Sequence, residues 1–161
     1  MLNLTSFIRF HARRTPDALA VIYGETRLDY ATLLTRIEKT AGLLVARGIG
    51  AGDIVAVVMK NSAAFIEIAF AASHIGAVFL PVNYRLAAEE VSYIAHHAGA
   101  KLAFADAEFS ALVAGLDNVI LVDPDAQSDS TRLASDAAPA SMHVVGPDDL
   151  FRLMYTSGTT D

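Results

Sequence analysis

The chain has 161 residues, 53% of them hydrophobic, and a mean hydropathy of +0.40, which is enough apolar material for one domain with a buried core. The formal net charge of -6 disfavours a nucleic-acid partner, because such proteins present a basic surface to the phosphate backbone. The sequence contains no cysteine, which excludes disulfide bonds and thiolate metal sites and favours a cytoplasmic setting.

The N-terminal region predicts a helix followed by a hairpin. Residues 4–14 are amphipathic, basic and free of acids. We expect a surface helix there, ended by Thr15-Pro16, because residues before a proline disfavour the helical conformation. A transit peptide has a similar composition and is the alternative interpretation. Residues 18–23 and 26–28 then flank a short Gly-Glu turn and predict two antiparallel strands.

A longer helix is expected over residues 30–47, with Asp29 as its N-terminal cap and Gly48 at its left-handed C-terminal end. Beyond it, continuous apolar runs alternate with helical periodicity. The expected strands are 54–59, 77–81, 101–105 and 119–122, and the expected helices are 63–75, 88–97 and 109–114. This alternation predicts an α/β fold with a layered, mostly parallel sheet flanked by helices, preceded by the N-terminal helix and β-hairpin.

No transmembrane segment is expected. The longest stretch without Asp, Glu, Lys or Arg is 68–84, and it contains His74, Gly76 and Pro81. It is shorter than the roughly 20 residues that a helix needs to cross a bilayer. A buried helix followed by a strand explains this stretch better.

The composition changes after the last of these strands. Residues 123–147 are rich in Asp, Ser, Ala and Pro, so we expect an exposed connector, with at most a short strand at 143–145. The connector leads to the apolar run 150–154, which predicts a final buried strand.

A hydroxyl- and glycine-rich loop directly follows that run. Small flexible residues at the end of a strand let main-chain N–H groups and hydroxyls converge on one anion. The candidate phosphate-binding residues are Thr156, Ser157, Gly158, Thr159 and Thr160. Three other interpretations are a serine nucleophile at Ser157, which lacks a nucleophile-elbow pattern, a Walker A loop, which lacks its lysine, and an unliganded polar connector.

Other polar residues predict structure rather than chemistry. His96 and His97 are adjacent on a predicted helix and point roughly 100° apart, so they do not form a metal site. The pairs Glu89-Glu90 and Asp148-Asp149 are expected to be acids at the start of helices, where they favour the helix dipole. His74 is expected to be a hydrogen-bonded core histidine. We expect no metal ligand among these residues.

Three segments together carry a family resemblance. They are 28–33 (Leu-Asp-Tyr-Ala-Thr-Leu), 74–83 (His-Ile-Gly-Ala-Val-Phe-Leu-Pro-Val-Asn) and 155–160 (Tyr-Thr-Ser-Gly-Thr-Thr). In this order they resemble the adenylate-forming superfamily of acyl-CoA synthetases, nonribosomal-peptide adenylation domains and luciferases. The run Pro-Val-Asn-Tyr-Arg-Leu at 81–86 is similar to the acyl-CoA ligase branch. One departure is Asp161, which stands where the family usually has glycine.

The resemblance implies an ATP-dependent acyl-CoA ligase. A carboxylic acid, fatty acids included, would react with Mg²⁺-bound ATP to give an acyl-adenylate and pyrophosphate, and coenzyme A would then displace AMP. Residues 156–160 would hold the ATP phosphates, and Tyr155 would set the direction of the loop. Two alternatives are an amino-acid or aryl adenylating enzyme that loads a carrier protein, and a non-catalytic ligand-binding or interaction module.

The resemblance also implies what this chain contains. Residues 1–161 would be the N-terminal portion of an AMP-binding domain, with the remaining catalytic groups outside it. We therefore expect the chain to be inactive by itself. The acyl substrate and the oligomeric state, a homodimer included, stay open at this point.

Overall fold

The computed structural model describes residues 3–123 and 137–156. The helices and strands in this part alternate as the sequence predicts. In chain order they are α1 (Thr5–Arg14), β1 (Leu19–Tyr23), β2 (Thr26–Asp29), α2 (Tyr30–Ala46), β3 (Ile54–Val58), α3 (Ala63–His74), β4 (Val78–Pro81), α4 (Ala88–Ala98), β5 (Ala100–Asp106), the 3₁₀ helix η1 (Ala107–Val113) and β6 (Val119–Val122).

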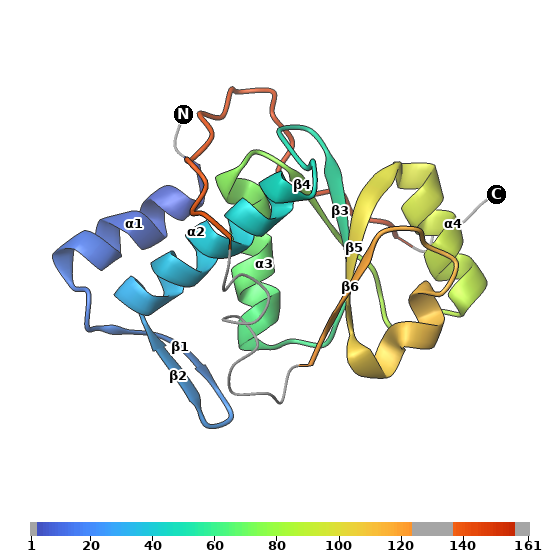
Figure 1. The fold of residues 1–161 in the computed structure, drawn as a ribbon, viewed down its shortest axis with the longest axis horizontal. Coiled ribbons are helices and arrows are strands. Elements are labelled where there is room, and N and C mark those ends of the chain that lie inside the picture. Colours follow the sequence, from blue (N-terminus) through green and yellow to red (C-terminus); the bar gives the residue numbers. More distant parts are fainter. Residues whose placement is uncertain (1–2, 124–136, 157–161) are drawn as a thin grey trace.

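A four-stranded sheet is the centre of the fold. Its strand order is β4-β3-β5-β6, and each neighbouring pair is parallel. The chain moves from β3 to β4 on one side and then returns across β3 to β5. Because parallel crossovers have one hand, this reversal places α3 and α4 on opposite faces. The predicted α/β fold with a parallel sheet between helices is confirmed (Figure 1).

The two faces of the sheet bury separate apolar clusters. Alternate residues of β3 point to opposite faces, so Val55 and Val57 join the cluster beneath α2 and α3, whereas Ala56 and Val58 join the one beneath α4 and η1. Burial on both faces explains why β3 reads as an unbroken apolar run. None of the helices within the described residues is long and apolar enough to cross a membrane.

The N-terminal elements form as their local signals predict. The Asp29 carboxylate accepts a hydrogen bond of 2.7 Å from the Thr32 N–H and caps α2. Gly48 follows the helix at a φ of 78°, the left-handed conformation that favours glycine. Strands β1 and β2 pair as an antiparallel hairpin beside the helices.

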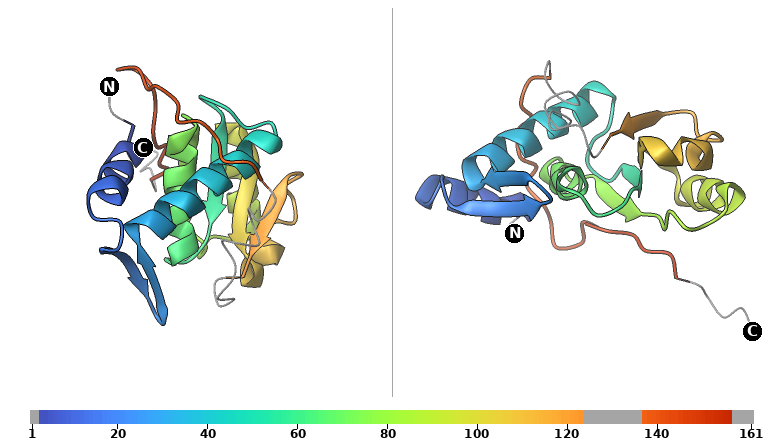
Figure 2. Two further views of the ribbon diagram at one scale, coloured as in Figure 1. Left: turned by 60° about the vertical axis from the view of Figure 1, so that its left-hand side comes forward. Right: turned by 90° about the horizontal axis from the view of Figure 1, so that it is seen from below.

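Residues 137–147, which sequence analysis assigns to a connector, contain no helix or strand. They lie against the outside of α2 and α3 (Figure 2). The Ala140 N–H donates to the Glu38 carbonyl oxygen at 3.1 Å, and the His143 N–H donates to the His74 carbonyl oxygen at 2.7 Å. The buried Asn3 side chain donates to the Ser73 carbonyl oxygen at 2.5 Å. Asn3 therefore lies at the junction where residues 140–143 contact α2 and α3.

His74 is the buried histidine of this junction, as predicted. Its ring is fully buried, and Nε2 donates to the Ala140 carbonyl oxygen at 3.0 Å. Burial lowers the pKa of His74 below its ordinary value of 6.5 and outweighs the opposite effects of the Ala140 hydrogen bond and of Glu38, while nearby Arg9 lowers the pKa further. The neutral imidazole is thus the form that the fold stabilises.

The prediction of a buried strand over 150–154 is wrong about burial. These residues make one isolated parallel bridge, between Arg152 and Phe79. Leu150 and Met154 are 64% and 56% exposed. The reason is position: the segment adds to the edge of the sheet beside β4, where only one side of its backbone is paired within the described residues.

Substituting Gly42 tests the packing of the connector on α2. Replacing glycine by alanine inside a helix normally stabilises it by about 1 kcal/mol. Here a Cβ at Gly42 would overlap the carbonyl oxygen of Ala138. We expect Gly42→Ala to lower the free energy of unfolding by about 1–3 kcal/mol in urea denaturation, the usual cost of overpacking. Gly50→Ala, where a Cβ meets open space, is the control and should change it little. A stabilising Gly42→Ala would contradict this packing.

The buried imidazole predicts a pH dependence of stability. Because the pKa of His74 is lower in the folded than in the unfolded chain, the unfolded chain takes up the proton first as the pH falls. The contribution of neutral His74 is complete above about pH 6.5 and declines below it, by at most about 1.4 kcal/mol per pH unit. His74→Gln should flatten the slope of unfolding free energy between about pH 6.5 and 5. Equal slopes for wild type and His74→Gln would refute the assignment.

Candidate functional site

The start of the predicted phosphate loop lies at the carboxyl edge of the sheet. The Phe79 N–H donates to the Phe151 carbonyl oxygen at 2.9 Å, and the Leu153 N–H donates to the Phe79 carbonyl oxygen at 3.1 Å. Since this bridge is parallel, the chain beyond Leu153 runs in the direction of β4 and reaches Thr156 beside the carboxyl end of that strand. Open α/β sheets bind their ligands at this edge.

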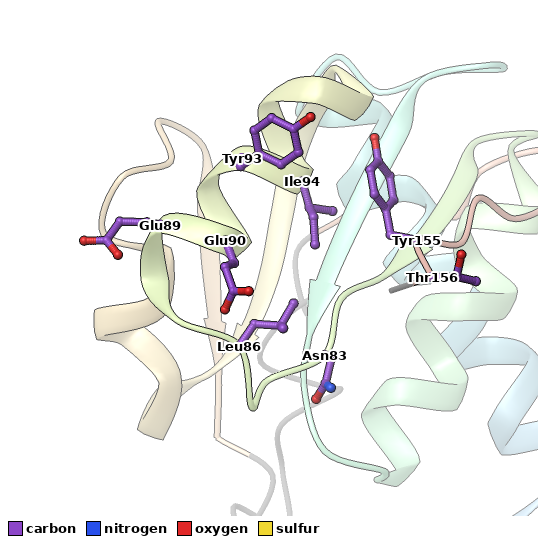
Figure 3. A pocket seen from close by; sticks show the side chains of 8 residues that line it. All are labelled: Asn83, Leu86, Glu89, Glu90, Tyr93, Ile94, Tyr155 and Thr156. Carbon is purple, nitrogen blue, oxygen red and sulfur yellow. The ribbon is translucent and has the colours of Figure 1, made fainter. Parts of the chain in front are cut away.

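A pocket of about 610 Å³ separates this segment from α4. Figure 3 shows Tyr155 and Thr156 on one side and the α4 residues on the other. Its lining combines apolar, aromatic and polar side chains. The lining residues are Asn83, Leu86, Glu89, Glu90, Tyr93, Ile94, Tyr155 and Thr156. The pocket therefore offers the loop a ligand-sized space at the sheet edge.

The two carboxylates of the pocket belong to the first turn of α4. Glu90 accepts a hydrogen bond of 2.8 Å from the Ala87 N–H, which confirms its predicted place at the helix start. Glu89 and Glu90 lie on the wall opposite Thr156 (Figure 3). None of the eight lining residues is basic, so the side chains of this pocket that can donate to an anion are neutral: the Asn83 amide and the hydroxyls of Tyr93, Tyr155 and Thr156.

The segment before Thr156 is held by alternate side chains. Leu153 and Tyr155 pack against the apolar cluster under α4, whereas Met154 between them is exposed. The Tyr155 hydroxyl and Nδ1 of His97 share a hydrogen bond of 2.5 Å, and their rings meet edge to face with centroids 5.8 Å apart. The start of the loop is therefore tied to the last turn of α4.

Of the predicted phosphate-binding residues, the structure places only Thr156, which is exposed and lines the pocket. The other four, Ser157, Gly158, Thr159 and Thr160, lie outside the described residues, as does Asp161. Their role as phosphate ligands therefore stays a prediction.

The remaining polar residues have identified partners. His96 Nδ1 lies 2.7 Å from the Ser92 carbonyl oxygen of its own helix, while His97 turns to Tyr155, so the adjacent histidines diverge as predicted. Asp149 is not at the start of a helix, contrary to expectation. Its carboxylate accepts a hydrogen bond of 2.8 Å from the Gly146 N–H and closes the turn that contains Pro147.

Sequence analysis also missed a charged contact at the carboxyl ends of β3 and β5. The Lys60 N–H donates to the buried Asp106 carboxylate at 2.7 Å. The Lys60 ammonium pairs with Glu108 at 2.8 Å, and this contact raises the pKa of Lys60. The strand order brings together groups almost fifty positions apart, and no local pattern indicates such a pairing.

Comparison with known proteins identifies relatives of this chain. The family model described as AMP-binding enzyme matches residues 8–160. A feruloyl-CoA synthase of Amycolatopsis is 39% identical over 150 residues, covering 92% of this chain and 30% of the relative. A fatty acid–[acyl-carrier-protein] ligase of Streptomyces coeruleorubidus is 36% identical over 164 residues, covering 98% of this chain and 31% of the relative.

The fold has a close counterpart among solved structures. The fatty acyl CoA synthetase of Mycobacterium tuberculosis superposes with a TM-score of 0.85 at 29% identity, over 96% of this chain and 32% of that one. The chain thus spans about a third of the length of the proteins it matches. Its segments at 28–33, 74–83 and 155–160 all fall within the range that the family model matches. The chain belongs to the AMP-binding enzyme family.

Proposed function

We propose that the chain is the N-terminal portion of an ATP-dependent acyl-CoA ligase. The enzyme joins a carboxylic acid to AMP, with release of pyrophosphate, and then transfers the acyl group to the thiol of coenzyme A, with release of AMP. The relatives named above include enzymes that form CoA thioesters from aromatic and from fatty acids. The proposal covers this reaction class and leaves the acid to experiment.

The observation that carries the proposal is the parallel bridge between Arg152 and Phe79. It delivers Thr156 to the carboxyl end of β4 and to a pocket of about 610 Å³. This edge is where α/β sheets receive nucleotides, and a Ser/Thr/Gly sequence supplies the hydroxyl and N–H donors that phosphate oxygens accept.

The described residues of the pocket offer neutral donors to ATP phosphates. The exposed Thr156 hydroxyl can donate to a phosphate oxygen, and the following residues of the loop continue that donor set in the proposal. The Glu89 and Glu90 carboxylates on the opposite wall repel an uncompensated polyphosphate. Mg²⁺ bound to ATP would neutralise part of that charge and polarise the phosphate groups.

Donors around the β- and γ-phosphates assist the first step by stabilising the departing pyrophosphate. Charge moves onto those oxygens as the acid attacks the α-phosphorus, so fixed donors contribute more in the transition state than in the ground state. In this proposal, residues 156–160 contribute part of this set of donors. A cytoplasmic location belongs to the same proposal.

A carrier protein is the second candidate acceptor. The Streptomyces coeruleorubidus relative is a fatty acid–[acyl-carrier-protein] ligase and is nearly as similar to this chain as the feruloyl-CoA synthase. Both acceptors bring a thiol to the same acyl-adenylate. Measuring product formation with coenzyme A and with a phosphopantetheinylated carrier protein distinguishes them.

The reaction is tested by ATP–pyrophosphate exchange in the complete protein. With a panel of aliphatic, aromatic and amino acids, we expect exchange that depends on the added acid. Thr156→Ala should reduce the exchange rate at low ATP about fivefold, the effect of losing about one hydrogen bond. Thr35→Ala, an exposed threonine of α2, is the control and should be unchanged. Exchange with no acid of the panel would contradict the proposed function.

The 161-residue chain alone should show neither exchange nor acyl-CoA formation, because it supplies only part of the set of phosphate donors. Mass-spectrometric detection of acyl-CoA after incubation with acid, ATP and coenzyme A is the measurement. If the isolated chain forms thioester above the level of a protein-free blank, the expectation that it is inactive by itself is wrong.

A further inference from the structure

The side-chain contact between His97 and Tyr155 occupies a particular place in the chain. Backbone hydrogen bonds tie the segment to β4 as far as Leu153. From residue 154 to 156, the Tyr155 hydroxyl makes the one hydrogen bond that the structure records to another part of the described chain. This side chain is therefore the last anchor before the candidate phosphate loop.

The partner of Tyr155 is itself fixed. His97 belongs to the last turn of α4, and Tyr93 stacks on its ring one turn earlier, with centroids 5.5 Å apart and planes 26° apart. Nδ1 of His97 lies 2.5 Å from the Tyr155 hydroxyl, within hydrogen-bond distance. The last turn of α4 thus presents the His97 ring to Tyr155, while its neighbour His96 bonds to its own helix.

The Tyr155 ring also has a defined packing site. It packs against the apolar cluster under α4 and lines the pocket beside Tyr93 (Figure 3). Thr156 follows in the sequence with an exposed side chain. A rotation of Tyr155 would therefore change the direction in which the chain leaves the sheet edge.

We propose that His97 is a positioning residue, which acts through the Tyr155 hydroxyl to orient the start of the phosphate loop. This inference rests on the proposed function, and it adds α4 to the parts of the chain that determine ATP binding. His97 holds Tyr155, and with it the adjoining Thr156, at the sheet edge, and no contact of its own with ATP is needed. Losing the contact leaves the fold intact but raises the KM for ATP.

The test uses steady-state ATP–pyrophosphate exchange by the complete protein. His97→Ala and Tyr155→Phe should each raise the KM for ATP about fivefold, as expected for one neutral hydrogen bond, with the KM for the acid unchanged. The double variant should resemble the single variants, because both remove the same interaction. His97→Asn, which offers a carbonyl acceptor, should restore part of the affinity, and His96→Ala should behave as wild type.

The outcomes separate this inference from the proposed function. A wild-type protein without exchange contradicts the proposed function. An active wild type in which His97→Ala and Tyr155→Phe keep the KM for ATP contradicts the positioning role alone. If either variant lowers only the maximal rate, in proportion to lost folded protein measured by circular dichroism, His97 has a structural role and the inference is wrong.

A readout independent of catalysis is available in the 161-residue chain. Amide resonances of an isotopically labelled sample should change at Thr156 in both His97→Ala and Tyr155→Phe, while those of β3 stay in place. His96→Ala should leave the Thr156 resonance unmoved. An unchanged Thr156 resonance in the first two variants would overturn the proposal.

Discussion

Two backbone hydrogen bonds at one residue determine where the candidate site lies. Phe79 donates to Phe151 and accepts from Leu153, at 2.9 and 3.1 Å, and so adds residues 151–153 to the edge of the sheet beside β4. Because the pairing is parallel, the residues that follow emerge at the carboxyl edge. A slip of one residue would turn Leu153 and Tyr155 away from the cluster under α4. The register and the site are therefore determined together.

The chain must also reach that edge. Strand β6 lies at one edge of the sheet, and Arg152 pairs beside β4 at the other. The described part of this path lies over α2 and α3 and is held by hydrogen bonds to Glu38 and His74. A glycine at position 42 leaves room for it on α2. The helical layer thus guides the connector to the site as well as covering the sheet.

Local sequence signals predicted most of the fold. The Asp29 cap, the glycine at 48 and the apolar run of β3 each depend on neighbouring residues and on burial, and each predicts its element. The apolar run 150–154 misled because strand propensity does not distinguish a central strand from an edge. For the site, the loop motif predicts the type of ligand, and the structure places Thr156 at the sheet edge.

Contacts between distant residues were beyond sequence reasoning. Thr40 donates its hydroxyl to the buried Glu67 between α2 and α3, and Tyr155 reaches His97 across 58 positions. Nothing in the neighbourhood of these residues identifies their partners, because the strand order and the crossovers bring them together. Sequence analysis accordingly concluded only that His97 is not a metal ligand, and it missed the contact of His97 with Tyr155.

Locating the phosphates of a non-hydrolysable ATP analogue in a crystal structure of the complete protein tests the central claim most directly. The phosphates should lie beside the carboxyl end of β4, with the β- and γ-phosphate oxygens within hydrogen-bond distance of residues 156–160. An analogue bound with its phosphates away from these residues would contradict the assignment of this edge as the phosphate site.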